Sequence, residues 1–173
     1  MPTWAAPASA GAYTSLASGT LSSTSVTISS IAGTYRNLVL VITNPYVNVS
    51  TNLGIRINGS STASYNGSYT YATSATRTLI GTNMTYWDIS GGGQIVTTAP
   101  TTDQFVCEIK EYASANVSKP MTTVSYNQNG DRAVNGIFSN VNTVTAAITS
   151  ITILTSNGTS TFSGGTYVLY GVK

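Results

Sequence analysis

Apolar and polar residues alternate along this chain over short stretches, and this period of two predicts β-strands rather than helices. Residues 53–57 and 105–109 are clear examples, with apolar side chains at every second position. Residues 37–43 are apolar on both faces, so we expect them in the middle of a sheet, covered on each side. Such stretches recur at short, regular spacing from Tyr13 to residue 172, which is typical of a sandwich or barrel.

Turn signals separate the predicted strands. Asn58 and Gly59 predict a type I′ hairpin turn, and residues 129–131 and 157–158 mark further turns. We count about ten strands, close to the eight of a jelly roll with short additions. The sequence therefore predicts an all-β protein: one jelly-roll-like antiparallel β-sandwich domain over residues 13–173, preceded by a short extended arm over residues 1–12.

Composition supports this fold class and restricts the partners. Only 7% of the residues are charged, against roughly 25% in an ordinary soluble domain, while Ser, Thr, Asn and Gly are abundant. The formal net charge is +2, and the seven Lys and Arg residues are scattered singly. Without a basic stripe to neutralise phosphates, we expect no nucleic-acid partner. Few charges also mean little repulsion between copies, which suits a protein that assembles.

The arm carries the one partner-binding site that we predict from sequence. Pro2 and Pro7 prevent a regular strand or helix through it, and Trp4 is its one large side chain. Either the arm is a solvated tail, or it docks onto a neighbour. Because a solvated tail gains nothing from a tryptophan, we assign partner binding to Pro2, Trp4 and Pro7.

Candidate chemistry is sparse. The chain has no histidine, which removes the commonest general base and every zinc site that depends on histidine. Its single cysteine, Cys107, lies on the apolar face of residues 105–109, so we expect a buried core residue rather than a reactive thiol. Glu108 and Glu111 would face opposite sides of a continuous strand, which makes them a poor glycosidase pair. We therefore expect no enzyme activity, no catalytic residue, no metal and no cofactor. The remaining carboxylates are Asp88, Asp103 and Asp131.

Two motifs and the tyrosines have alternative interpretations. Residues 91–93 are three glycines, but no Gly-Lys-Ser/Thr ending follows, so we expect a flexible hairpin end rather than a phosphate loop. Residues 127–131 resemble part of a calcium loop but lack its later glutamate, so we expect a turn. The eleven tyrosines suit a sugar- or protein-binding surface as well as packing between strands, and we favour packing for most of them.

No apolar run approaches the roughly 20 residues of a membrane helix, so we expect no membrane partner. The first residues lack the basic start and apolar core of a signal peptide, so we expect synthesis in a cytosol without export by the chain's own leader.

Four local patterns together resemble a known family. These are residues 31–38, residues 55–59 with Tyr65 after them, residues 148–153, and the closing stretch 165–173. They resemble the jelly-roll domains of tail-fibre and capsid-decoration proteins of tailed bacteriophages, especially those infecting marine and freshwater bacteria such as cyanobacteria. The resemblance spans most of residues 13–173, and it implies a homotrimeric virion protein without enzyme activity.

The short arm favours one member of that group. A tail-fibre domain usually follows a long stem, whereas only about a dozen residues precede this domain. We therefore expect a capsid decoration (cement) protein on the exterior of the virion, a trimer whose partners are itself and the major capsid protein. The alternative is a tail-fibre or receptor-binding adhesin that contacts host glycans. A third interpretation, a bacterial surface lectin, is disfavoured by the missing export signal.

Overall fold

Strands make up all the regular structure of the described residues. The computed structural model describes residues 13–72, 76–99, 101–127, 132–140 and 145–173. These contain no helix and twelve strands: β1 (Tyr13–Thr20), β2 (Ser25–Ile28), β3 (Asn37–Val47), β4 (Leu53–Ile57), β5 (Tyr65–Ala72), β6 (Thr76–Met84), β7 (Trp87–Asp88), β8 (Gln104–Ile109), β9 (Met121–Asn127), β10 (Arg132–Asn140), β11 (Ile151–Thr155) and β12 (Phe162–Val172).

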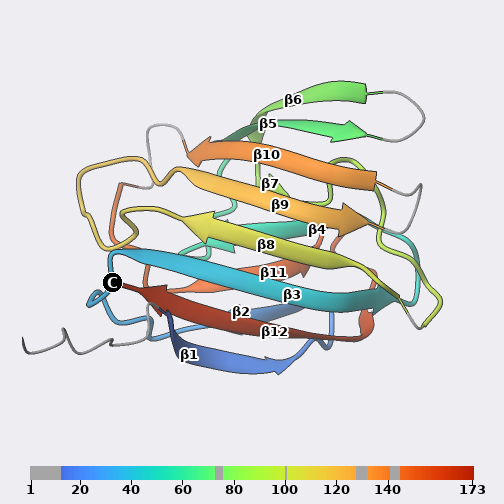
Figure 1. The fold of residues 1–173 in the computed structure, drawn as a ribbon, viewed down its shortest axis with the longest axis horizontal. Helices are drawn as coiled ribbons and strands as arrows, with labels where there is room; N and C mark the ends of the chain where they lie inside the picture. The colour runs from blue at the N-terminus through green and yellow to red at the C-terminus, as the bar shows by residue number, and fades with distance from the viewer. Residues whose placement is uncertain (1–12, 73–75, 100, 128–131, 141–144) are drawn as a thin grey trace, which may run out of the picture.

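The strands form two stacked antiparallel sheets of unequal size. The large sheet has eight strands in the order β1-β12-β3-β8-β9-β10-β5-β6, and the small sheet has four in the order β2-β11-β4-β7. Figure 1 shows the large sheet in front of the small one. The predicted fold class, an all-β antiparallel sandwich, is confirmed.

The core lies between the sheets and is built from the strand alternation. Leu40 and Phe105 on the large sheet and Ile55 and Ile153 on the small sheet are fully buried. Trp87 is also fully buried; its ring meets the Tyr65 ring edge-on, with centroids 5.3 Å apart. Cys107 is buried in the core, as predicted.

The prediction that both faces of residues 37–43 are covered needs correction. β3 does lie inside the large sheet, between β12 and β8, but only one of its faces packs against the small sheet. Leu38, Leu40 and Ile42 face that core, whereas Val39 and Val41 lie on the opposite face of the sheet. The outer face of β3 is thus apolar as well, with Val39 only 9% exposed, but no second layer of described residues covers it.

Asn58 and Gly59 form the predicted turn, but it does not close a hairpin. Both have positive φ, 50° and 65°, and Ser60 N donates to Ile57 O at 3.0 Å, as a type I′ turn requires. The strands on either side are β4 of the small sheet and β5 of the large one, which are not paired. The turn therefore carries the chain from one layer to the other.

The three consecutive glycines form a packed turn rather than a flexible hairpin end. Gly91 has φ of 64°, and a Cβ there would lie 2.8 Å from both methyl groups of Val134 on β10. Gly93 O accepts a hydrogen bond from Asn127 Nδ2 at 3.1 Å. The segment after β7 thus covers the inner face of β9 and β10. The predicted turn at residues 129–131 lies outside the described residues.

Candidate binding surface

The outer face of the large sheet, meaning the side chains that point away from the small sheet, is unusually apolar. Eight large hydrophobic side chains are exposed in the described residues, and six of them belong to this face. Val124 and Ile137 are 62% and 70% exposed, and Ile80 is 75% exposed. The other three are Tyr13, Val106 and Tyr126.

The strand register aligns four valines into one row. Val124 of β9 is paired with Val106 of β8, Val106 with Val41 of β3, and Val41 with Val168 of β12. Paired residues on one face of a sheet have Cβ atoms roughly 5 Å apart, so the four side chains form a continuous apolar ridge. We call these four residues the valine row.

Charge is nearly absent from this surface. Among the described strand side chains of the outer face, Glu108 is the only one with a carboxylate, ammonium or guanidinium group. Its Oε1 accepts a hydrogen bond from Asn37 Nδ2 at 3.2 Å. Between the apolar residues lie neutral ones such as Thr122 and Asn135. A partner that covers this face therefore meets hydroxyls, amides and methyl groups rather than an electrostatic field.

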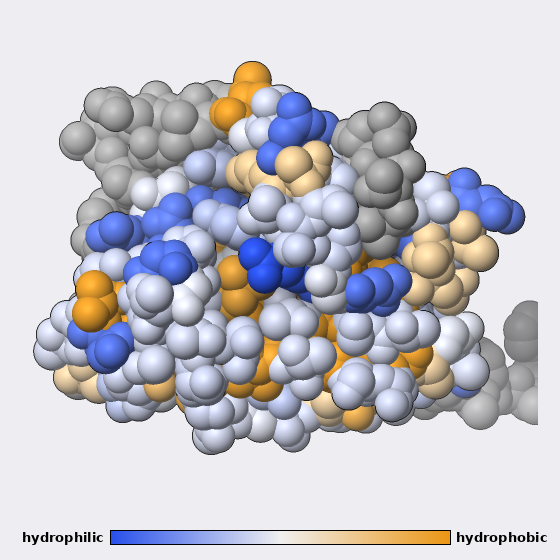
Figure 2. Space-filling view, turned by 180° about the vertical axis from the view of Figure 1, so that it is seen from behind, coloured by the Kyte–Doolittle hydropathy of each residue, from blue (hydrophilic) through white to orange (hydrophobic). Residues whose placement is uncertain are grey.

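The face is large enough for a stable protein contact. Eight strands about 4.8 Å apart give a width of roughly 38 Å, and six residues of a central strand span about 20 Å. The product, roughly 750 Å², is close to the ~800 Å² that each partner contributes to an ordinary specific interface. The opposite side of the molecule is mostly pale, with apolar atoms between the polar ones and at the edges (Figure 2).

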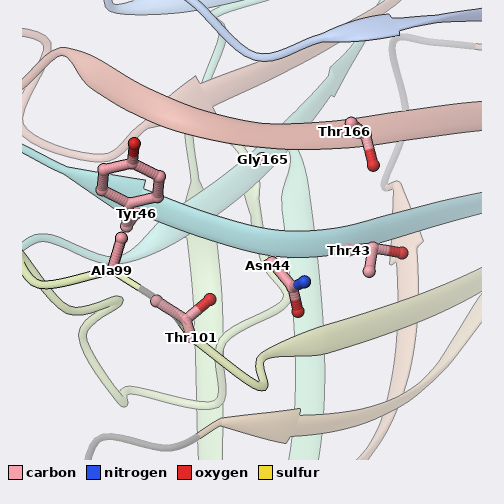
Figure 3. A pocket seen from close by; sticks show the side chains of 7 residues that line it. All are labelled: Thr43, Asn44, Tyr46, Ala99, Thr101, Gly165 and Thr166. Carbon is pink, nitrogen blue, oxygen red and sulfur yellow. The ribbon is translucent and has the colours of Figure 1, made fainter.

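A hollow of about 260 Å³ lies at one end of this surface. Its wall includes the Tyr46 ring, which lies across Gly164, where a Cβ would be 2.2 Å from the ring. Figure 3 shows Tyr46, Asn44 and Thr101 around it. The Oγ1 of Thr101 is buried and has no hydrogen-bond partner in the described structure. Neutral polar groups beside an aromatic ring suit a neutral sugar. The full lining is Thr43, Asn44, Tyr46, Ala99, Thr101, Gly165 and Thr166.

The carboxylates do not assemble into a site. Asp88 is buried, and Asn52 Nδ2 (2.8 Å) and Ser90 Oγ (2.7 Å) donate to its oxygens. Burial raises the pKa of its carboxyl above the ordinary value. Glu111 pairs with Arg36 at 3.3 Å on the surface. Among the described residues, no three groups of the kinds that bind metal come together.

Other potentially reactive groups are buried. Burial raises the pKa of the Cys107 thiol to about 12, which removes its thiolate at neutral pH. Asp103 is fully buried on the loop before β8. Asp131 lies outside the described residues, as do the predicted partner-binding residues Pro2, Trp4 and Pro7. No helix in the described part of the chain is long and apolar enough to cross a membrane.

Sequence reasoning missed the outer face, although a signal for it was present. In residues 105–109 the buried positions are Phe105, Cys107 and Ile109, and Val106 is an additional apolar residue out of phase with them. Val124 and Ile137 stand out of phase in the same way in β9 and β10. Apolar residues at positions that alternation assigns to solvent were the available signal.

Comparison with known proteins identifies no family. No protein-family model and no curated protein sequence matches the chain. Among solved structures, the chain is similar to a mutant of the alginate lyase Aly36B in complex with an alginate tetrasaccharide, at 10% identity, over 90% of this chain and 80% of that chain. The TM-score is 0.27, which is too low to carry any conclusion about fold or activity.

Proposed function

We propose that this protein is a structural component of a bacteriophage virion, a homotrimeric decoration protein that binds the outer capsid shell and stabilises it. It is made in the host cytoplasm and performs no catalysis. The observation that carries the proposal is the outer face of the large sheet, with its valine row and near absence of charge. Six exposed large apolar side chains gathered on one face mark a contact site for another protein.

The chemistry of the face defines the partner. Methyl groups and neutral hydroxyls gain little from a charged surface, since a charge buried against them loses its hydration without compensation. The partner surface is therefore neutral and apolar, and we assign it to the major capsid protein. Three copies on one trimer present three such faces, so modest contacts add up to firm retention by multivalency.

Copy number tests the proposal directly. Purified virions would be separated on a denaturing gel and the band of this protein compared with that of the major capsid protein. A decoration protein is present in a number near that of the capsid protein, whereas a fibre tip is present in far fewer copies. In a second experiment, purified protein is mixed with undecorated shells and sedimented. A faint gel band together with a failure to cosediment would refute the decoration role.

The hollow beside Tyr46 favours one alternative, a receptor-binding adhesin that contacts host surface glycans. Tyr46 provides an aromatic wall, and Thr101 provides a buried hydroxyl that a sugar hydroxyl would satisfy. The variant Tyr46→Ala separates the two functions, because the hollow is distinct from the valine row. Loss of cell or glycan binding in this variant, with shell binding unchanged, would favour the adhesin; loss of neither would leave the hollow without a role.

A further inference from the structure

A fully buried lysine lies at the end of the sandwich where the C-terminus is found. Lys119 belongs to residues 110–120, the segment that connects β8 with β9 (Figure 1), and its side chain is 0% exposed. Burial lowers the pKa of its ammonium group, because a charge loses hydration there. Lysine is almost never fully buried unless its ammonium group has partners. The virion role gives no reason for placing a charge at this position.

Backbone carbonyls face this ammonium group. Its Nζ donates to Val117 O at 2.8 Å, to Thr145 O at 3.0 Å, and to Ser114 O. Ser114 and Val117 belong to the same segment as Lys119, whereas Thr145 precedes β11, so the ammonium group joins two segments that are distant in the sequence. Inward-facing carbonyl oxygens can replace the hydration shell of a cation, as they do in the filters of potassium channels. We call these three carbonyls the carbonyl cage.

The segment that provides most of the cage is closed at its base and attached to its neighbour. Lys110 N donates to Pro120 O at 3.0 Å, so the two ends of the segment meet. A compact loop whose ends meet in this way is an Ω-loop. Tyr112 is fully buried, and its carbonyl oxygen accepts a hydrogen bond from Ile148 N at 2.8 Å, which ties the loop to the residues before β11. These contacts do not involve the buried ammonium group, so they hold the cage in place when that group is removed.

The spacing and charge of the cage determine which cations fit it. Sites for Ca²⁺ and Mg²⁺ use carboxylates and place their oxygens at roughly 2.0–2.6 Å from the metal. Val117 O and Thr145 O lie farther from Nζ, at 2.8 and 3.0 Å, and carbonyl oxygens are neutral. This spacing suits a monovalent cation as large as ammonium, a class that includes potassium.

We propose that the carbonyl cage is a binding site for a monovalent cation of the size of ammonium or potassium, and that the ammonium group of Lys119 fills it as a built-in ligand. The tether holds the cation at a high effective concentration, so occupancy does not depend on the surrounding salt. The filled site joins residues 110–120 to the segment before β11 through a charge and carbonyl dipoles rather than through apolar packing. This inference goes beyond the virion role and does not depend on it.

Variants of the full chain that empty the cage test the proposal. Lys119→Met keeps an apolar stem and removes the ammonium group, whereas Lys119→Ala deletes a group with the atoms of propylammonium. Lys110→Ala is the matched control, because it removes an exposed lysine from the base of the same loop. Trp87 is fully buried in the core, so its fluorescence reports unfolding of each variant.

Melting temperatures are compared in chloride salts at equal ionic strength, with tetramethylammonium, which is too large for the cage, as the baseline. At a potassium concentration about ten times its dissociation constant, we expect Lys119→Met to melt about 3–5 °C higher than in the baseline salt. Ammonium should act in the same way. Propylammonium should stabilise Lys119→Ala, and its neutral counterpart 1-propanol should not. The unsubstituted protein and Lys110→Ala should melt at the same temperature in potassium as in tetramethylammonium.

The same measurements can refute the cation site. Variants of Lys119 that melt alike in potassium and tetramethylammonium, or that stay unfolded in every salt, would overturn it. A rise that also appears in Lys110→Ala would be a general effect of salt and would overturn it equally. A rise in sodium as large as that in potassium would contradict the size of cation that the carbonyl spacing indicates.

Discussion

Replacing one valine of the valine row by a carboxylate should abolish binding through the outer face while leaving the fold intact. Val124 is the best position, because its side chain is 62% exposed and sits in the middle of the large sheet, on β9. Val124→Glu places a charge next to Val106 and near Glu108, the carboxylate already on this face. No described cation on the strands of this face is available to neutralise it.

The exposed position of Val124 implies a small change in the free energy of unfolding and a large loss of binding free energy. A substitution at so exposed a position changes the free energy of unfolding by about 0.5 kcal/mol, plus at most ~1 kcal/mol for the lower strand propensity of Glu. In a bound complex the new carboxylate is desolvated without a partner, which costs about 2–5 kcal/mol. At about 1.4 kcal/mol for each factor of ten, this weakens binding by roughly 30-fold to several thousand-fold.

The assay is cosedimentation with undecorated shells, with urea denaturation of the same samples to measure stability. Val49→Glu is the matched control, since Val49 is 58% exposed but lies after β3, away from the outer face. We expect Val124→Glu to lose shell binding and Val49→Glu to keep it. Equal binding by the two variants would refute the assignment of the outer face as the docking surface.

Four further predictions concern three buried groups, Cys107, Tyr65 and Lys119. Cys107, with its pKa raised to about 12 by burial, should resist a thiol reagent in the native protein and react fully in denaturant; rapid native labelling would contradict the structure. Tyr65→Phe leaves Ile57 N and Ser60 O without their buried partner, which should cost about 1–3 kcal/mol in urea denaturation. Burial raises the Tyr65 pKa above 10.0, so the unfolded chain releases this proton first as the pH rises; stability should therefore fall as the pH increases beyond 10, less steeply in Tyr65→Phe than in the unsubstituted protein. Lys119→Met deprives three loop carbonyls, including Thr145 O at 3.0 Å, of their donor and should destabilise the protein by about 2–4 kcal/mol; a loss under ~1 kcal/mol would mean that water replaces the ammonium group.

The fold class could be predicted because alternation reports strand faces directly. Phe105, Cys107 and Ile109 were placed on one buried face from sequence, and the structure confirms it. Sheet order could not be predicted in the same way. β1 pairs with β12 at the far end of the chain, and Asn58 and Gly59 connect two sheets instead of one hairpin. Local residue patterns determine a turn type but not which distant strand lies beside a given one.

The candidate surface was harder to predict for a related reason. Val41, Val106, Val124 and Val168 come from four different strands, and each alone is an unremarkable strand residue. They become a surface only when the register aligns them. The sequence therefore drew attention to Trp4, a single conspicuous residue, and missed a surface whose members are individually ordinary.

The requirements of the fold do not explain the apolar residues of the outer face. Thr serves a strand as well as Val or Ile does, because both are β-branched, and Thr keeps a hydroxyl for water. The same face uses Thr at residues 43, 122 and 166, so β3, β9 and β12 each tolerate it there. Val124 and Ile137 nevertheless expose most of their side chains, which gains no burial and favours nonspecific association. The chain is otherwise rich in Ser and Thr, yet on this face it places four valines side by side. The departure is explained if the row is buried in an assembly, because only there do the methyl groups leave water and contribute free energy.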